Sequence, residues 1–287
     1  MRVPAFAAAL LLALSAAPAA ALPGVWVVRD ADTEITLFGT IHALPKAENW
    51  QSPSLLARLD AADTLVLEAV IPEDRFALAP VIAQLGMRPG QKPLVARVSP
   101  AAARRIPAAA AAAGVPLAAL DRMDSWLAAI TLSEATLTAM GITADSGVEP
   151  ALELRARAAK KAVIGLETPE QQLRFLAGLP QVDQVAMLEA TLDDLGTARQ
   201  DTEKLIALWR VGDVEAIARD FAKEAKASPV LQAVLLTNRN RRWVDWIAGV
   251  MNRPGKVFIA VGSGHFGGQD GLLALLKARG LVVQQVE

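Results

Sequence analysis

Short apolar runs alternate with amphipathic stretches at both ends of the chain, and the two ends follow the same order. Each end shows an apolar strand, a turn, an amphipathic helix and a second apolar strand. These segments are residues 35–38, 52–61 and 64–68 near the start, and 257–261, 270–279 and 281–283 near the end. Strands of this length joined through a helix are typical of βαβ units, whose parallel strands lie side by side. The pattern therefore predicts a sheet built from both ends of the chain.

The middle of the chain, from about residue 72 to residue 250, has a mostly helical pattern. Apolar residues at helical spacing, separated by polar or glycine breaks, predict helices over residues 101–113, 124–140, 182–195, 201–210, 213–225 and 229–250. Pro107 is expected to kink or divide the first of these helices. One short strand, residues 162–166, interrupts the region, and Thr168 and Pro169 behind it open a further helix.

The domain organisation follows from these segments. A polar turn at residues 30–33 separates two apolar runs and predicts a hairpin ahead of the first unit. No low-complexity linker separates the helical middle from the two ends. Residues 22–287 are therefore predicted to form one α/β domain, with a mixed, mostly parallel sheet from the N- and C-terminal portions, flanking helices and a largely helical middle. A long helical insertion is the alternative.

The composition of the chain restricts the cellular compartment and the classes of binding partner that we expect. Arg2, an apolar stretch over residues 5–17 and the small residues 19–21 predict that residues 1–21 are a signal peptide. The mature protein is then periplasmic or secreted, with no stable membrane insertion after cleavage, because no other stretch is long and apolar enough to span a bilayer. The chain has no cysteine and a formal net charge of -1, which gives no electrostatic reason to expect nucleic acid as a partner.

The two histidines of the chain are the leading candidates for chemistry. His42 closes the sequence Gly-Thr-Ile-His after the first strand, and His265 closes Gly-Ser-Gly-His after the strand at residues 257–261. Both are predicted to lie just past the carboxyl ends of strands, where ligands bind in open α/β sheets. Glu68 ends its own strand, and we expect it at the same edge.

This residue set restricts the chemistry. The GxSxG, HExxH and P-loop motifs are missing, and there is no cysteine nucleophile. Two histidines with a carboxylate suit Mn, Co, Fe or catalytic Zn, and Glu68 is the candidate third ligand or general base for a bound water. The alternative is structural: each histidine bonds a neighbouring loop, and Glu68 pairs with an arginine at the sheet edge.

Other polar residues have weaker patterns. The cluster at residues 239–242 lies on the last long helix, where Arg239 and Asn240 are candidates to hold a substrate carboxylate or a developing oxyanion. Glu149 fits the acidic start of a helix, where it complements the helix dipole. Glu167, at the end of the strand at residues 162–166, is interpreted as a support for its loop.

Several ordered motifs together resemble the TraB/GumN family, which also includes the Tiki proteins of animals. The resemblance covers nearly the whole mature sequence. The motifs are Leu37-Phe38-Gly39-Thr40-Ile41-His42, Leu65-Val66-Leu67-Glu68, Gly165-Leu166-Glu167-Thr168 with Glu170-Gln171-Gln172, Arg239-Asn240, Val261-Gly262-Ser263-Gly264-His265 and Asp270-Gly271-Leu272-Leu273.

This resemblance implies a mixed sheet flanked by helices and a distant relation to erythromycin esterases. Tiki proteins are described as metal-dependent proteases using Mn or Co, which implies a metal site at His42, Glu68 and His265, with Zn as a further candidate. In the esterase relatives the corresponding histidines are thought to act directly as acid and base.

We therefore expect an exported metal-dependent hydrolase, in first place a peptidase, that acts on a peptide or small ester. In this hypothesis Arg239 stabilises the negative charge of the transition state. The alternatives are a non-catalytic periplasmic protein that binds a metal, haem or a peptide, and a metal-free esterase with histidine as base.

Overall fold

A six-stranded sheet forms the centre of the protein. The computed structural model describes residues 22–224 and 228–287, so the predicted signal peptide lies outside the described residues. The strands are β1 (Val25–Arg29), β2 (Thr33–Thr40), β4 (Thr64–Ala69), β6 (Ala162–Glu167), β7 (Gly255–Gly262) and β8 (Val283–Gln285). Their order across the sheet is β6-β4-β7-β2-β1-β8. A separate two-stranded sheet pairs β3 (Leu44–Pro45) with β5 (Ile142–Thr143).

The pairing confirms a mixed, mostly parallel sheet. Strands β6, β4, β7 and β2 are all parallel to one another, whereas β1 is antiparallel to both β2 and β8. The predicted hairpin is therefore β1–β2. One detail of the prediction was wrong: the strands of each βαβ unit do not lie side by side. Strand β7 inserts between β2 and β4, and β8 lies at the far edge of the sheet next to β1.

Helices cover both faces of the sheet, which explains why the central strands are apolar at nearly every position. One face packs against α1 (Pro53–Ala61), α6 (Val148–Ala158), α9 (Ala198–Arg210) and α10 (Val214–Glu224). The other face packs against α12 (Asn238–Val250) and α13 (Leu272–Ala278). Within β4, Leu65 and Leu67 belong to the first core and Val66 to the second, as the two-residue repeat of a strand requires.

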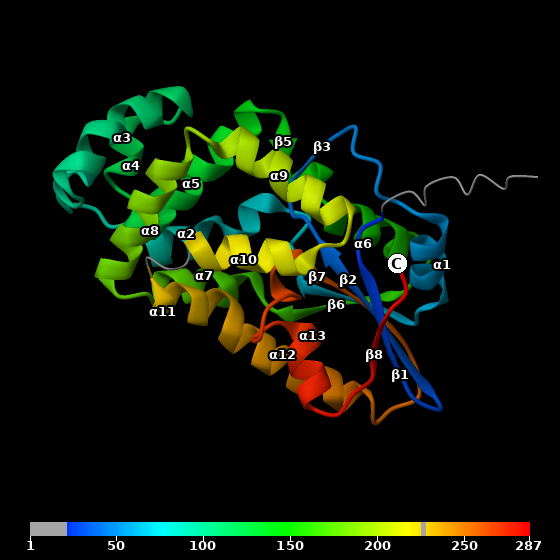
Figure 1. Ribbon diagram of the computed structural model, residues 1–287. Helices are drawn as coiled ribbons and strands as arrows, with labels where there is room; N and C mark the ends of the chain where they lie inside the picture. The colour runs from blue at the N-terminus through cyan, green and yellow to red at the C-terminus, as the bar shows by residue number, and fades with distance from the viewer. Residues whose placement is uncertain (1–21, 225–227) are drawn as a thin grey trace, which may run out of the picture.

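A third hydrophobic core belongs to helices away from the sheet. The helices α3 (Pro100–Ala112), α4 (Leu117–Leu120), α5 (Ser125–Ala139) and α8 (Gln181–Asp194) pack around it, and we call residues 94–139 and 181–195 the helical lobe. Figure 1 shows this lobe extending to the left of the sheet. The helices α2 (Ala79–Gly86), α7 (Pro169–Ala177) and α11 (Pro229–Gln232) complete the helical middle. Among residues 22–224 and 228–287, the segments Arg75–Leu78, Leu94–Ala96, Ala144–Ser146 and Ser263–His265 are 3-10 helical turns.

Local signals account for most helix boundaries. The Ser52 hydroxyl caps α1, and Thr168 with Gln171 forms a capping box at the start of α7. Two expectations differ from the structure. Pro107 lies inside a continuous α3, and the predicted helix over residues 229–250 is divided into α11, a π-helical turn at Ala233–Thr237 and α12.

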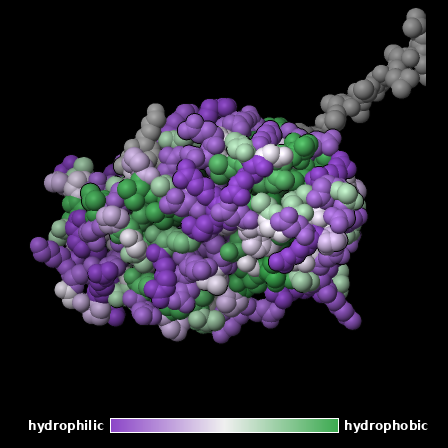
Figure 2. Space-filling model, turned by 90° about the horizontal axis from the view of Figure 1, so that it is seen from below, coloured by the Kyte–Doolittle hydropathy of each residue, from purple (hydrophilic) through white to green (hydrophobic). Residues whose placement is uncertain are grey.

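The surface mixes polar and apolar side chains. Figure 2 shows hydrophobic residues in small groups among hydrophilic ones on the face seen from below. Within residues 22–224 and 228–287, no helix combines the length and the apolar character that crossing a bilayer requires.

Candidate active site

The pairing of β2 with β7 brings the two GxxH turns together. Thr40 lies opposite Gly262 in the parallel register, so both strands end at the same level of the sheet. Strand β4 flanks β7 on its other side, and its register places Glu68 beside the end of β7. Three segments that are far apart in the sequence therefore meet at the carboxyl edge of the sheet.

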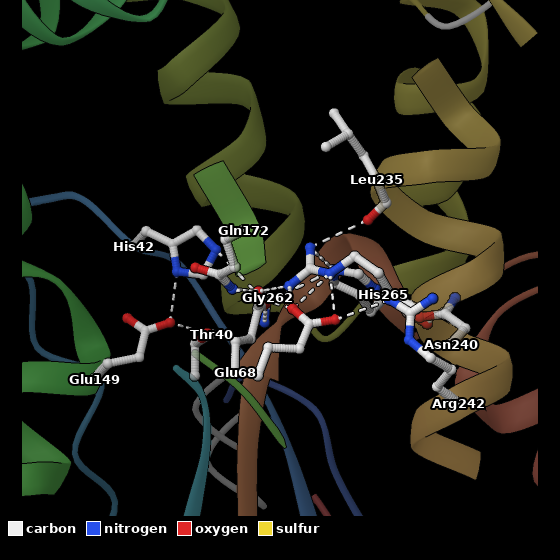
Figure 3. A network of polar contacts seen from close by, with 12 residues as sticks. Thr40, His42, Glu68, Glu149, Gln172, Leu235, Asn240, Arg242, Gly262 and His265 are labelled. Carbon is white, nitrogen blue, oxygen red and sulfur yellow. Dashed lines mark hydrogen bonds and ion pairs between the residues drawn. The ribbon is translucent and has the colours of Figure 1, made fainter. Parts of the chain in front are cut away.

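Glu68 lies between the two histidines (Figure 3). Its Oε1 atom is 3.7 Å from Nε2 of His42 and 3.7 Å from Nε2 of His265, and it accepts a hydrogen bond from the backbone N–H of Gly262 at 2.8 Å. Glu68 and His265 are buried, whereas 64% of the His42 side chain is exposed. His42 is therefore the histidine that a substrate can reach from solvent.

A carboxylate from α6 orients His42. The Glu149 Oε1 atom lies 2.6 Å from His42 Nδ1 and also accepts a hydrogen bond from the Thr40 hydroxyl at 2.5 Å. Glu149 is in the first turn of α6, as the sequence predicted, but its side chain bonds the catalytic candidate as well as facing the helix dipole. A Cβ atom at Gly147 would lie 2.1 Å from the His42 carbonyl oxygen, so glycine there allows α6 to begin against the first GxxH turn.

Asn240 on α12 orients His265 in the same way. Its Oδ1 atom lies 2.6 Å from His265 Nδ1, and its Nδ2 donates to the Asp270 carbonyl at 2.8 Å and the His265 carbonyl at 3.3 Å. These two carbonyl acceptors fix the amide orientation, so Nδ1 of His265 carries the proton and Nε2 keeps its lone pair. Asn240 is buried, and it was predicted to contact a substrate; the structure instead places it behind the histidine.

Arg239 is buried at the centre of the site, with all five of its N–H groups engaged. Its Nε donates to Glu167, and its Nη2 to Glu68 Oε2 at 2.5 Å and to Glu167 Oε2 at 2.7 Å. Its Nη1 donates to the Leu235 carbonyl at 3.1 Å and lies 3.3 Å from His265 Nε2. The predicted oxyanion role does not fit this arrangement, because no N–H remains for a substrate. Arg239 is a positioning residue, and the pairing of Glu68 with an arginine, considered above as the structural alternative, is present.

Two residues from α7 and α12 extend this network. The Gln172 amide lies 3.4 Å from both Glu68 Oε2 and Glu167 Oε2. Arg242 donates to Glu167 Oε1 at 3.2 Å and lies over the ring of Phe175. Glu167, predicted to support its loop, therefore holds two arginines and fixes α12 against β6.

The electrostatic environment separates the three titrating groups. Partial burial opposes protonation of His42, but the charge and hydrogen bond of Glu149 and the charge of Glu68 raise its pKa to about 9. Burial lowers the pKa of His265 to about 4 against the opposing charge of Glu68. Burial would raise the pKa of Glu68, but the two histidines, Arg239 and the Gly262 N–H lower it to about 2. At neutral pH the site holds an imidazolium at His42, a carboxylate at Glu68 and a neutral His265.

The fit of a divalent ion can be tested against this geometry. In favour, both Nδ1 atoms have partners and both Nε2 atoms face one carboxylate oxygen, which is how metal-binding histidines are held. Against, Arg239 donates to His265 Nε2 and to Glu68 Oε2, so a guanidinium cation occupies the lone pair of His265 and lies beside the position that an ion would take. Among the described residues, no group of three His, Cys, Asp or Glu side chains is arranged to hold a metal. In this arrangement the residues do not fit the ion, and the metal stays a prediction.

The fold and the site define a class: α/β proteins in which two GxxH histidines on adjacent parallel strands face one glutamate. The chain belongs to the TraB/PrgY/gumN family, whose model matches residues 24–285, and this confirms the family expected from the sequence. It is similar to two relatives, both named Uncharacterized protein YbaP, from Escherichia coli (strain K12) and Shigella flexneri. Each is 24% identical over 255 residues, which cover 89% of this chain and 92% of the relative. No solved structure matches the chain.

Proposed function

We propose that this protein is an exported hydrolase that cleaves a peptide or small ester by acid–base catalysis, with His42 as the acid and Glu68 as the base. Export rests on the composition of residues 1–21, which fits a signal peptide and a periplasmic or secreted location. The substrate class rests on the exposed acid candidate His42 beside the base candidate Glu68, since hydrolysis of an acyl bond uses such a pair.

The observation that carries the proposal is the contact between His42 and Glu68, two groups whose environments move their pKa values apart. When two neighbouring titrating groups are shifted in opposite directions, the pair provides an acid and a base at one pH. Their 3.7 Å separation is too short for a water between the two atoms, but a water beside them can hydrogen-bond both the Glu68 oxygen and a histidine nitrogen. Glu68 accepts the proton of the attacking water, and His42 donates its Nε2 proton to the leaving group.

The neighbouring residues hold this pair in place. Glu149 keeps His42 charged and fixes the ring with Nε2 toward Glu68. Arg239 holds the second oxygen of Glu68, so that Oε1 stays directed at the two histidines. His265, neutral and buried, presents Nε2 to the same oxygen and completes the wall of the site.

The metal-dependent peptidase expected from the family resemblance is the second candidate. One observation favours it: the Nε2 atoms of His42 and His265 converge on Glu68, with Nδ1 of each ring already bonded. This candidate requires Arg239 to release His265, since one lone pair cannot serve both partners. Mn or Co is then the expected ion, with Zn as a further candidate.

The test measures hydrolysis by the mature chain, residues 22–287, with nitrophenyl esters and a peptide library, each with and without chelator. We expect turnover that chelator leaves unchanged, and a loss of roughly 100-fold or more in His42→Gln and in Glu68→Gln. Glu153→Gln is the matched control, because Glu153 lies on α6 one turn after Glu149 and, within the described part of the chain, pairs with Arg157.

Each other outcome overturns the proposal. Activity that chelator abolishes and Mn or Co restores would establish the metal-dependent peptidase. Stoichiometric ligand binding without turnover of any ester or peptide would establish a binding protein. Full activity in Glu68→Gln would remove the base from the mechanism.

A further inference from the structure

A cleft of about 470 Å³ lies between the helical lobe and the helices α9 and α10. It is separate from the polar network of His42, Glu68 and His265, none of which line it. The cleft follows the seam between two hydrophobic cores: Leu205, Leu208 and Phe221 pack on the edge of the sheet core, and Leu195 packs on the edge of the lobe core. Seams between separately packed units are common places for ligand sites, and the volume suits a small molecule.

The cleft leaves apolar surface without a protein partner. Six apolar side chains from α5, α9, α10 and the residue after α8 line it: Leu137, Leu195, Leu205, Leu208, Ile217 and Phe221. Five of them are only partly buried, although they point into a concave site, and Ile217 forms the buried floor. Concave apolar surface of this kind binds the hydrocarbon part of a ligand because water is released from both surfaces.

The charges at the rim of the cleft are unbalanced. Two lysines, Lys204 and Lys223, both pair with Asp220, at 2.5 and 3.1 Å. Asp194 and Asp201 also line the cleft, and neither forms an ion pair with a cation among the described residues. Burial and the charges of Asp201 and Asp193 accordingly raise the pKa of Asp194. A positive group placed between Asp194 and Asp201 would relieve this repulsion.

We propose that the cleft binds an amphipathic cation, a molecule with an apolar body and one positively charged end. The apolar body lies on the leucines and Phe221, and the cation lies at the rim between Asp194 and Asp201. This proposal does not depend on the proposed hydrolysis.

Two contacts connect the cleft to the GxxH turns. The Phe221 ring packs on the second turn, where a Cβ atom at Gly264 would lie 2.7 Å from it. Trp209, next to Leu208 on α9, donates from its indole N–H to the Gly39 carbonyl of the first turn at 2.7 Å. A ligand in the cleft therefore touches the helices that hold both histidine turns.

The test is calorimetric titration of the mature chain with three octyl probes that differ only in charge: octylamine, 1-octanol and octanoate. We expect octylamine to bind about threefold to tenfold more tightly than 1-octanol, as a partly exposed charge contact allows, and octanoate to bind most weakly. The double variant Asp194→Asn/Asp201→Asn should bind octylamine and 1-octanol equally. Asp193→Asn, which removes the adjacent charge that pairs with Arg105 outside the cleft, should retain the preference.

A second variant tests the location. Ala198→Trp fills the cleft from the start of α9 and should abolish binding of all three probes, while far-ultraviolet circular dichroism reports whether it folds. Equal affinity of the three probes for the wild-type chain would overturn the cation proposal, as would an octylamine preference that survives Asp194→Asn/Asp201→Asn. Undiminished binding in a folded Ala198→Trp variant would place the probes elsewhere and overturn the site.

Discussion

Replacing Glu149 with glutamine tests the electrostatic basis of the site directly. The substitution removes one negative charge 2.6 Å from His42 and keeps an oxygen that can accept the Nδ1 proton. The ring orientation is therefore retained while the charge that stabilises the imidazolium is lost. We expect the pKa of His42 to fall from about 9 toward the ordinary histidine value.

The size of this fall follows from the geometry. A single opposite charge within hydrogen-bond distance shifts a pKa by roughly 1 to 3 units. Glu68, 3.7 Å from Nε2, remains in the variant and sustains part of the shift, and 64% of the His42 side chain faces water, which screens charge. We therefore expect a fall in the lower half of that range, roughly 1 to 2 units.

The assay is proton NMR titration of the imidazole C–H signals. The chain has only two histidines, so His42→Gln assigns both sets of signals. Glu153→Gln is the control, since it removes the same charge from the same helix without a contact to His42. If His42 acts as the acid, the alkaline limb of the pH–rate profile should move down by the same amount in Glu149→Gln. A wild-type His42 that titrates near pH 6.5, or a pKa that Glu149→Gln leaves unchanged, would refute the reasoning.

Three further predictions concern stability and metal binding. Gly147→Ala should lower the free energy of unfolding by about 3 kcal/mol or more, because the added Cβ would lie 2.1 Å from a carbonyl oxygen. Gly249→Ala, in open space within α12, should raise the free energy of unfolding by up to about 1 kcal/mol. Urea unfolding measures both. His265 is neutral in the folded protein, so its contribution of about 3 kcal/mol to the free energy of unfolding should be present above pH 6.5 and lost as the pH falls through 4. The free energy of unfolding of His265→Gln should therefore vary less between these pH values. Arg239→Ala should lower the free energy of unfolding by roughly 3 to 5 kcal/mol, because it leaves the buried Glu68 carboxylate without its arginine. Co²⁺ should raise the melting temperature of this variant but not that of the wild type.

These predictions can each fail in a defined way. Equal effects of Gly147→Ala and Gly249→Ala would mean that the turn adapts to a side chain. The same acid-side stability loss in His265→Gln and wild type would assign that loss to other groups, such as Glu68 at lower pH. A Co²⁺-dependent rise in the wild-type melting temperature would show that Arg239 does not prevent metal binding.

The sequence predicted which segments form strands and helices better than it predicted which strands lie side by side. The strand at residues 257–261 is apolar throughout, which indicates burial on both faces but not which strand pairs with it. Its insertion between β2 and β4 depends on packing of the whole chain, and hydrophobic periodicity carries no such information. The π-helical turn at Ala233–Thr237 could not be predicted from the sequence either, because its residues continue a normal helical pattern.

The candidate site shows a similar division. The two GxxH turns and Glu68 were identified because strand ends converge at one edge of a sheet. Glu149 was interpreted only as a helix-dipole residue, since its partner His42 is 107 positions away in the sequence. The contacts of Arg239 could not be predicted, because its acceptors come from four separate segments, and only their arrangement shows that all five N–H groups are engaged.

The carboxyl edge of the sheet joins parts of the chain that are synthesised far apart in time. The Gly262 N–H bonds Glu68 across 194 residues, and β7 is the second-last strand to be made. The site therefore cannot form on an N-terminal fragment that ends before residue 265, and contacts of such separation form slowly. These residues therefore meet only after β7 has been completed and inserted between β2 and β4. If the proposed export precedes folding, the site forms only in the compartment in which folding finishes.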